Sequence, residues 1–140
     1  MKKRFGKVKA SFHRCKCPNN HLFVSGLIAF IAFLLLELTA RIYNLYRTLP
    51  DIDVPSHFLA GIALGLGIYW IFSLTEVQKK KTFTLIFVAI AAGIWEVLET
   101  LQELIVTHPT YLKDIFFWDG FWDIIVTFIG GLFSLLILHY

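Results

Sequence analysis

The residues best suited to chemistry are one histidine and several carboxylic acids that interrupt apolar segments. His57 begins one apolar segment, Glu96 and Glu99 lie within the next, and Asp123 lies near the start of the last. Carboxylate oxygens together with one imidazole nitrogen suit Mg²⁺, Mn²⁺ or Zn²⁺. Carboxylates that lie close together also share protons, because their negative charges repel. The residue types therefore predict a cation-binding or proton-exchanging site.

Helical spacing places these groups on common faces. On one segment His57, Gly61 and Gly65 follow at intervals of four, and on the last segment Asp119, Asp123, Thr127, Gly130 and Ser134 form a similar stripe. A third stripe contains Ala89, Gly93, Glu96, Thr100 and Glu103, with Glu99 at its edge. Small residues mark close helix approach in lipid, so we expect the acids to point into a helix bundle.

The predicted pocket is polar and opens at one membrane face. Its candidate residues are Asp53, His57, Glu96, Glu99, Glu103, Asp119 and Asp123. A metal version of the site has His57, Glu99 and Asp123 as ligands, and the possible cofactor is then a divalent cation. Glu37 and Arg41, spaced i,i+4 with the acid first, form a supporting ion pair.

Four apolar segments must position these side chains. The chain of 140 residues allows one domain, and its composition is 57% hydrophobic and 16% charged with a mean hydropathy of +0.68. So much apolar surface in blocks of about 20 residues indicates helices that cross a bilayer. We predict an all-α membrane protein, a four-transmembrane-helix bundle. The expected units are a basic N-terminal tail, 1–21, and a transmembrane domain, 22–140, with spans at about 22–46, 55–75, 82–106 and 121–140.

The distribution of lysine and arginine predicts the orientation. Seven of the thirteen basic residues precede residue 17, and three more lie in the loop 76–81. By the positive-inside rule both termini and this loop are cytoplasmic, and the loops 47–56 and 107–120 face outward. Nine of the ten acids then lie toward the outer face. We expect a multi-pass protein of the plasma (inner) membrane of a bacterium, in contact with membrane lipids.

Simpler roles exist for several of these residues. Asp51, Asp53 and Asp119 could cap helix N-termini, and Glu103 could reach the interface. His57 could be a hydrogen-bonded interior histidine.

The basic tail invites two further interpretations. His13, Cys15, Cys17 and His21 offer four zinc ligands, but this spacing is tighter than in the usual structural zinc sites. We expect both thiols to be reduced and unpaired. Basic residues before a membrane span set orientation and contact anionic lipid, and no run of aromatic residues offers a stacking surface, so we expect no nucleic-acid partner.

Three motifs in order resemble the VanZ-like and YjdF-like families of small bacterial membrane proteins. They are Asp53-Val-Pro-Ser-His57-Phe58, Trp95-Glu96-Val-Leu-Glu99, and Asp119-Gly-Phe-Trp122-Asp123 leading to Gly130-Gly131. The likeness covers about residues 51 to 135 and is closer to the YjdF-like group. It implies a four-helix envelope protein whose histidine and acids form its signature, and it supplies no reaction. Thr127 departs from the asparagine expected in these families.

Three functions follow as hypotheses. The first is a cell-envelope protein whose outward acidic and histidine pocket binds a cation or a polar lipid head group. The second is a proton- or cation-coupled transporter, which would act as a homo-oligomer because four helices are few for a carrier. The third is a metal-dependent lipid or phosphate-ester hydrolase. A structural role stays open beside these, in which the polar pocket only fixes the register of the helices. The sequence leaves open whether the protein is an enzyme.

Overall fold

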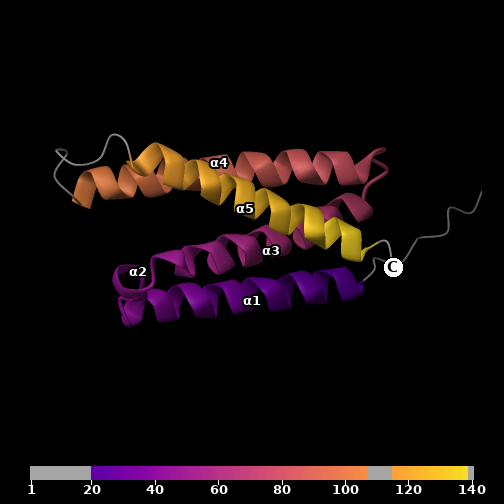
Figure 1. The fold of residues 1–140 in the computed structure, drawn as a ribbon. Coiled ribbons are helices and arrows are strands. Elements are labelled where there is room, and N and C mark those ends of the chain that lie inside the picture. Colours follow the sequence, from indigo (N-terminus) through magenta and orange to yellow (C-terminus); the bar gives the residue numbers. More distant parts are fainter. Residues whose placement is uncertain (1–19, 107–114, 139–140) are drawn as a thin grey trace, which may run out of the picture.

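The computed structural model describes residues 20–106 and 115–138, and this part of the chain is almost entirely helical. Its elements in order are α1 (Asn20–Ile42), α2 (Leu45–Thr48), the 3₁₀ turn η1 (Pro50–Ile52), α3 (Asp53–Ser73), α4 (Lys80–Val106) and α5 (Ile115–Ile137) (Figure 1). Within the described residues, four helices are long and apolar enough to cross a membrane: α1, α3, Lys80–Gln102 of α4 and Trp118–Ile137 of α5. The predicted fold class is therefore confirmed.

Local chemistry accounts for the helix ends. The first predicted span ran to about residue 46, but α1 ends at Ile42 because Asn44 adopts a left-handed backbone with φ 53°. Asparagine tolerates this conformation better than most residues. Pro55 lies in the first turn of α3, where its missing N–H leaves no hydrogen bond unmade. At the other end of α3, Lys80 Nζ donates to the carbonyl oxygens of Ser73 at 3.4 Å and Thr75 at 2.8 Å.

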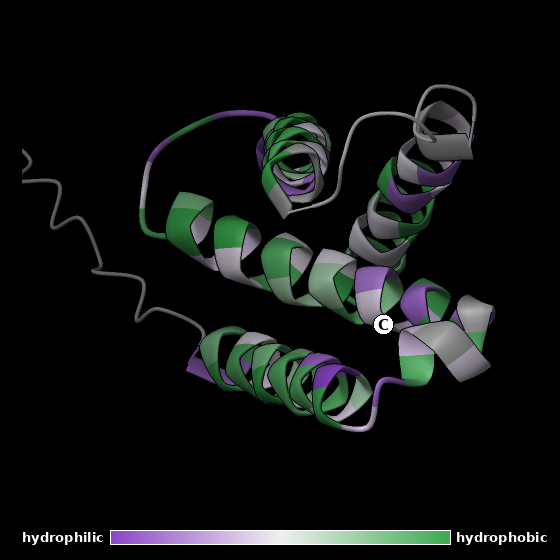
Figure 2. Ribbon diagram, turned by 90° about the vertical axis from the view of Figure 1, so that its left-hand side faces the viewer, coloured by the Kyte–Doolittle hydropathy of each residue, from purple (hydrophilic) through white to green (hydrophobic). Residues whose placement is uncertain are grey.

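Successive long helices run in opposite directions, with α3 in the centre (Figure 1). α3 packs against α1 on one side and against α5 and α4 on the other, and α4 also packs against α5. Both views show α3 between α1 and the α4–α5 pair (Figures 1 and 2). The start of α1 and the end of α5 lie at the same end of the bundle (Figure 1). The starts of α3 and α5 therefore share the opposite end, where the predicted acids lie.

Small residues form the tightest helix contact, between α3 and α5. A Cβ added to Gly61 would clash with the backbone of Thr127, and one added to Gly65 would clash with the Ser134 hydroxyl. From the other side, Gly130 leaves no room for a Cβ against the carbonyl oxygen of Phe58. The predicted stripes on these two segments thus face each other directly.

The predicted stripe on α4 lies beside the most buried face of the helix, and Gly93, Glu96 and Thr100 line the cavity between α4 and α5. The buried face of α4 carries Thr84, Val88 and Ala92 at intervals of four, and Val88 packs where Gly131 of α5 has no side chain. Gly93 has open space around it and Thr100 is exposed. Counting four onward from Ala92 reaches Glu96, so the helix still turns this acid toward the bundle.

Apolar side chains cover the outside of the bundle. Large hydrophobic residues on α1, α4 and α5 are exposed, including Ile28, Leu35, Val97 and Leu136. Most of the helical ribbon in Figure 2 is coloured as hydrophobic. In water this surface would be strongly unfavourable, whereas lipid tails are as apolar as the side chains themselves. The chain is a multi-pass membrane protein in contact with lipid.

The two native cysteines test the predicted orientation. Cys15 and Cys17 are the only cysteines of the sequence, and both precede the first span. A membrane-impermeant maleimide is expected to leave intact cells unlabelled and to label the chain after permeabilisation. In a Cys15→Ser, Cys17→Ser background, Asp51→Cys is expected to react in intact cells. The reverse labelling pattern would mean that the acid-rich end faces the cytoplasm.

Gly61 and Gly67 form a matched pair for the α3–α5 contact. Gly61→Ala introduces a clash with the Thr127 backbone, whereas a Cβ at Gly67 meets no atom within 4 Å. We expect Gly61→Ala to destabilise the protein by about 1–3 kcal/mol, the usual cost of overpacking. Gly67→Ala should cause no loss. Thermal unfolding in detergent micelles measures both, and equal midpoints would contradict the packing described here.

Candidate functional site

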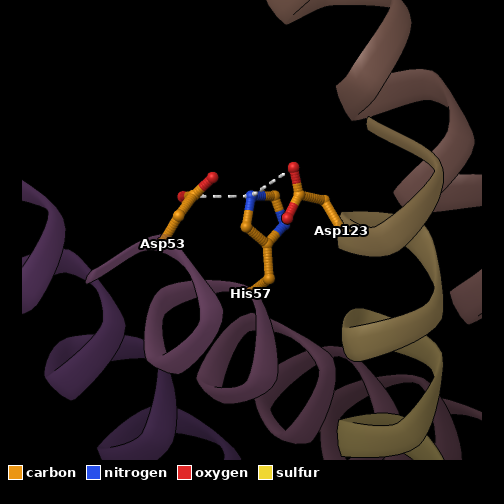
Figure 3. Close-up of side chains that lie close together, drawn as sticks. All are labelled: Asp53, His57 and Asp123. Carbon is orange, nitrogen blue, oxygen red and sulfur yellow. Dashed lines mark ion pairs between the residues drawn. The ribbon is translucent and has the colours of Figure 1, made fainter. Parts of the chain in front are cut away.

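His57 forms the centre of a cluster at the end of the bundle where α3 and α5 begin. Its side chain is buried, with 7% of the residue exposed. Nε2 lies 3.3 Å from Asp53 Oδ1, one turn earlier on α3, and 3.9 Å from Asp123 Oδ2 on α5 (Figure 3). The helical interval of four aligns Asp53 with His57, and the close α3–α5 contact brings Asp123 to the same nitrogen.

The other ring nitrogen faces different partners. His57 Nδ1 lies 3.3 Å from Thr127 Oγ1 and 3.8 Å from Glu96 Oε1. Glu96 Oε1 is buried and has no hydrogen-bond partner among the described residues. Its second oxygen lies against Gly120, where a Cβ would come within 2.9 Å of Oε2. Each side of the imidazole therefore meets at least one carboxylate.

Two groups of side chains could hold a metal ion in the described part of the chain. One is Asp53, His57 and Asp123, and the other is His57, Glu96 and Glu99, with the ligand atoms of each group within 4.8 Å of one another. The predicted ligand set His57, Glu99 and Asp123 is not such a group. Glu99 belongs to the second group, and it also accepts a hydrogen bond at Oε2 from Trp95 Nε1 at 3.1 Å.

Glu37 joins three elements beside this cluster. Its Oε1 accepts a hydrogen bond from Arg41 Nε at 2.6 Å, so the two residues form the ion pair expected from their spacing. Its Oε2 accepts from Tyr46 Oη at 2.5 Å and from Ser56 Oγ at 3.0 Å. Burial, and then the hydrogen bond to Glu37, raise the pKa of Tyr46 well above its usual range, so this phenol stays protonated and remains a donor.

The remaining predicted residues lie elsewhere. Asp119 is exposed and belongs to neither metal-compatible group, and it cannot cap α5 because that helix begins at Ile115. Asp53 is the first residue of α3, whose N-cap is Ile52, and its side chain faces His57. The side chain of Glu103 lies outside the described residues. So do His13, Cys15 and Cys17 of the hypothetical zinc site.

A cavity of about 510 Å³ begins at this cluster and continues between α1, α3 and α4. The polar residues that line it are Glu37, Asp53, Ser56, His57, Glu99 and Thr127. All its other lining residues are apolar, among them Phe30 of α1, Ile68 of α3 and Ala92 of α4. Glu96 lines a separate, smaller cavity of about 360 Å³ between α4 and α5. The main cavity is therefore polar at the end beside His57 and apolar along the rest of its length.

Comparison with known proteins places the chain in a family. The family described as "Predicted membrane protein (DUF2238)" matches residues 14–140, which is most of the sequence. The chain belongs to the DUF2238 family. This membership is consistent with the YjdF-like resemblance, whereas the VanZ-like resemblance stays a prediction. No curated protein and no solved structure matches the chain.

Sequence reasoning missed three polar contacts of this DUF2238 protein. Tyr46 and Ser56 reach Glu37, and Thr127 reaches His57. Thr127 was on the predicted stripe, so its helical spacing already indicated that it faces inward. Tyr46 follows Asn44, whose left-handed backbone ends the helical spacing of α1. The spacing therefore could not predict on which side Tyr46 lies. The Ser56 contact depends on how α1 packs against α3, which the local sequence does not specify.

Substitution of Tyr46, with Tyr43 as the control, tests whether the hydrogen bonds of Glu37 stabilise the protein. Tyr46→Phe removes one hydrogen bond to a carboxylate, and we expect a loss of about 1–2 kcal/mol. Tyr43 is 71% exposed, so Tyr43→Phe should have almost no effect. Thermal unfolding in the same detergent compares the two. A Tyr46→Phe protein as stable as the Tyr43→Phe control would show that the network contributes nothing.

Proposed function

We propose that this protein binds a divalent cation between Asp53, His57 and Asp123, at the membrane face where α3 and α5 begin. One observation carries the proposal: the two nitrogens of the buried His57 face separate sets of partners. Nε2 faces two carboxylates, and Nδ1 faces a hydroxyl and a third carboxylate. A metal-binding histidine characteristically has its free nitrogen held by an acceptor of this kind.

The distances suit such a site. Oxygen and nitrogen ligands lie about 2.0–2.2 Å from a zinc ion, so ligand atoms of one site lie within about 4.4 Å of each other. The three proposed ligand atoms are separated by no more than 4.8 Å. Small side-chain rotations close the remaining difference. Hard oxygen ligands with one imidazole accept Mg²⁺, Mn²⁺ or Zn²⁺.

The local charge also favours a cation. Among the side chains that the structure describes, five carboxylates, those of Glu37, Asp53, Glu96, Glu99 and Asp123, gather here with Arg41 and His57. Arg41 is already paired with Glu37. Ionised side chains in a membrane span are costly and are usually paired. A divalent ion would offset the negative charge that Arg41 and His57 leave uncompensated.

Cation binding is compatible with the binding, transport and hydrolase functions that the sequence suggests. A carrier would also need a polar route across the bilayer, but beyond Thr127 the residues that line the described cavity are apolar. A hydrolase would need a bound substrate in addition to the metal. The arrangement of His57 and the acids therefore favours a binding site over ion transport.

Asp123 and Asp119 provide the test, because they lie one turn apart on α5 and only Asp123 belongs to the proposed ligand set. The purified protein should contain about one divalent ion per chain by elemental analysis, or take up Mn²⁺ after chelation, as measured by electron paramagnetic resonance. Asp123→Asn should weaken Mn²⁺ binding at least tenfold. Asp119→Asn should bind as the wild type does.

The unfolding temperature provides a second measure of metal binding at this site. A bound ion stabilises the folded state by mass action, so Mn²⁺ should raise the unfolding temperature of wild type and Asp119→Asn but not of Asp123→Asn. Folding of Asp123→Asn is checked by its helical circular dichroism. A wild-type protein that holds no metal and whose melting is unchanged by Mn²⁺, Mg²⁺ and Zn²⁺ would refute the proposal.

A further inference from the structure

The main cavity extends far beyond the polar cluster. Along α3 its lining continues from Ser56 to Ile71, fifteen residues or about 22 Å at 1.5 Å per residue. This is most of the ~30 Å thickness of a bilayer's hydrocarbon core. The end of the cavity farthest from His57 includes Phe23, whose ring centroid lies 4.9 Å from that of Trp70. A metal ion and its ligands need only a small part of this length.

None of the described helices covers the side of the cavity opposite α3. α1 and α4 line it from its two flanks, yet each packs on α3 and the two make no extensive contact with each other in the described part of the chain. Figures 1 and 2 both show α3 between these two helices. Since the bundle lies in a membrane, the open side faces lipid tails. A molecule could enter from the bilayer without leaving the apolar phase.

We infer that this cavity is a lateral binding site for a phosphate-bearing membrane lipid, with one hydrocarbon chain along α3 and the phosphate at the cation beside His57. The place of the head group depends on the cation proposed above, whereas the place of the chain depends on the cavity alone. A phosphate cannot approach the bare carboxylates, because like charges repel. Divalent ions are commonly held by one or two carboxylates and complete their coordination with phosphate oxygens.

Shape and polarity both match such a lipid. The polar lining, including Glu99 and Ser56, is confined to the end near the membrane face, where a lipid head group resides. The apolar lining follows at greater depth, where lipid chains reside. The volume of about 510 Å³ lies within the ~300–1,000 Å³ of ordinary ligand sites.

Two glycines allow a matched test of the chain site. Gly67 lines the main cavity and Gly93 the smaller one, and an added Cβ meets no atom within 4 Å at either position. Gly67→Leu should fill the main cavity, and Gly93→Leu should leave it open. Gly67 lies ten residues, or about 15 Å, from His57 along α3, so its substitution should leave the metal content unchanged.

The full chain is reconstituted in vesicles of phosphatidylglycerol and phosphatidylethanolamine with a trace of phosphatidylglycerol that carries a diazirine on one acyl chain. After illumination, mass spectrometry maps the cross-links. We expect labelling of cavity residues such as Leu27 and Ile68, at least fivefold weaker in Gly67→Leu and undiminished in Gly93→Leu. Chelation, or Asp123→Asn, should also weaken this labelling.

The outcomes separate this inference from the cation proposal. Equal labelling in both glycine variants would mean that only surrounding lipid is detected, and would overturn the lipid site while leaving the metal site standing. Cavity labelling that Gly67→Leu blocks but chelation does not change would overturn the head-group placement. Cavity residues that stay unlabelled by the lipid, together with a dimer on size-exclusion chromatography that Gly67→Leu abolishes, would identify a second copy as the occupant and overturn the inference.

Discussion

The burial of His57 among carboxylates is the constraint on which the rest of the site depends. In a bilayer a polar group finds no water, so each ionisable side chain must reach a partner within the protein. His57 meets this requirement through four side chains from three helices: Asp53 on its own helix, Asp123 and Thr127 on α5, and Glu96 on α4. These contacts fix the rotation of all three helices about their axes.

Close packing of α3 and α5 makes those contacts possible. The glycines at positions 61, 65 and 130 let the two backbones approach until no Cβ would fit between them. Van der Waals contact between small residues is a main source of helix association in lipid, where the hydrophobic effect contributes little. The same seam therefore both stabilises the bundle and sets the distance from His57 to Asp123. The polar residues of the site and the small residues of the contact lie on the same faces of α3 and α5.

The sequence predicted the parts of this structure that depend on composition and helical period. Four spans follow from hydropathy, and His57, Asp123, Thr127 and the glycines followed from spacing on α3 and α5. On α4 the same reasoning found the side that faces α5 but not the most buried face, because small residues occur on two adjacent faces and only tertiary contact selects Val88 and Ala92 over Gly93. The sequence also could not divide the acids between the two ring nitrogens, since that depends on rotamers and on sub-ångström helix placement.

The cavity has an open side because of how α1 contacts the rest of the bundle. α1 is joined to the bundle through α3 and through the polar network of Glu37, and it does not close over α4. A fully closed four-helix bundle would have filled this space with side chains, as bundles around an apolar core do. Here small residues of α3 and α4, such as Ala63, Gly67 and Ala91, line the space without filling it. An unfilled apolar volume next to lipid tails is readily entered by a hydrocarbon chain, because lipid loses no favourable contact by moving from one apolar surface to another. The polar end then determines what kind of head group can accompany that chain.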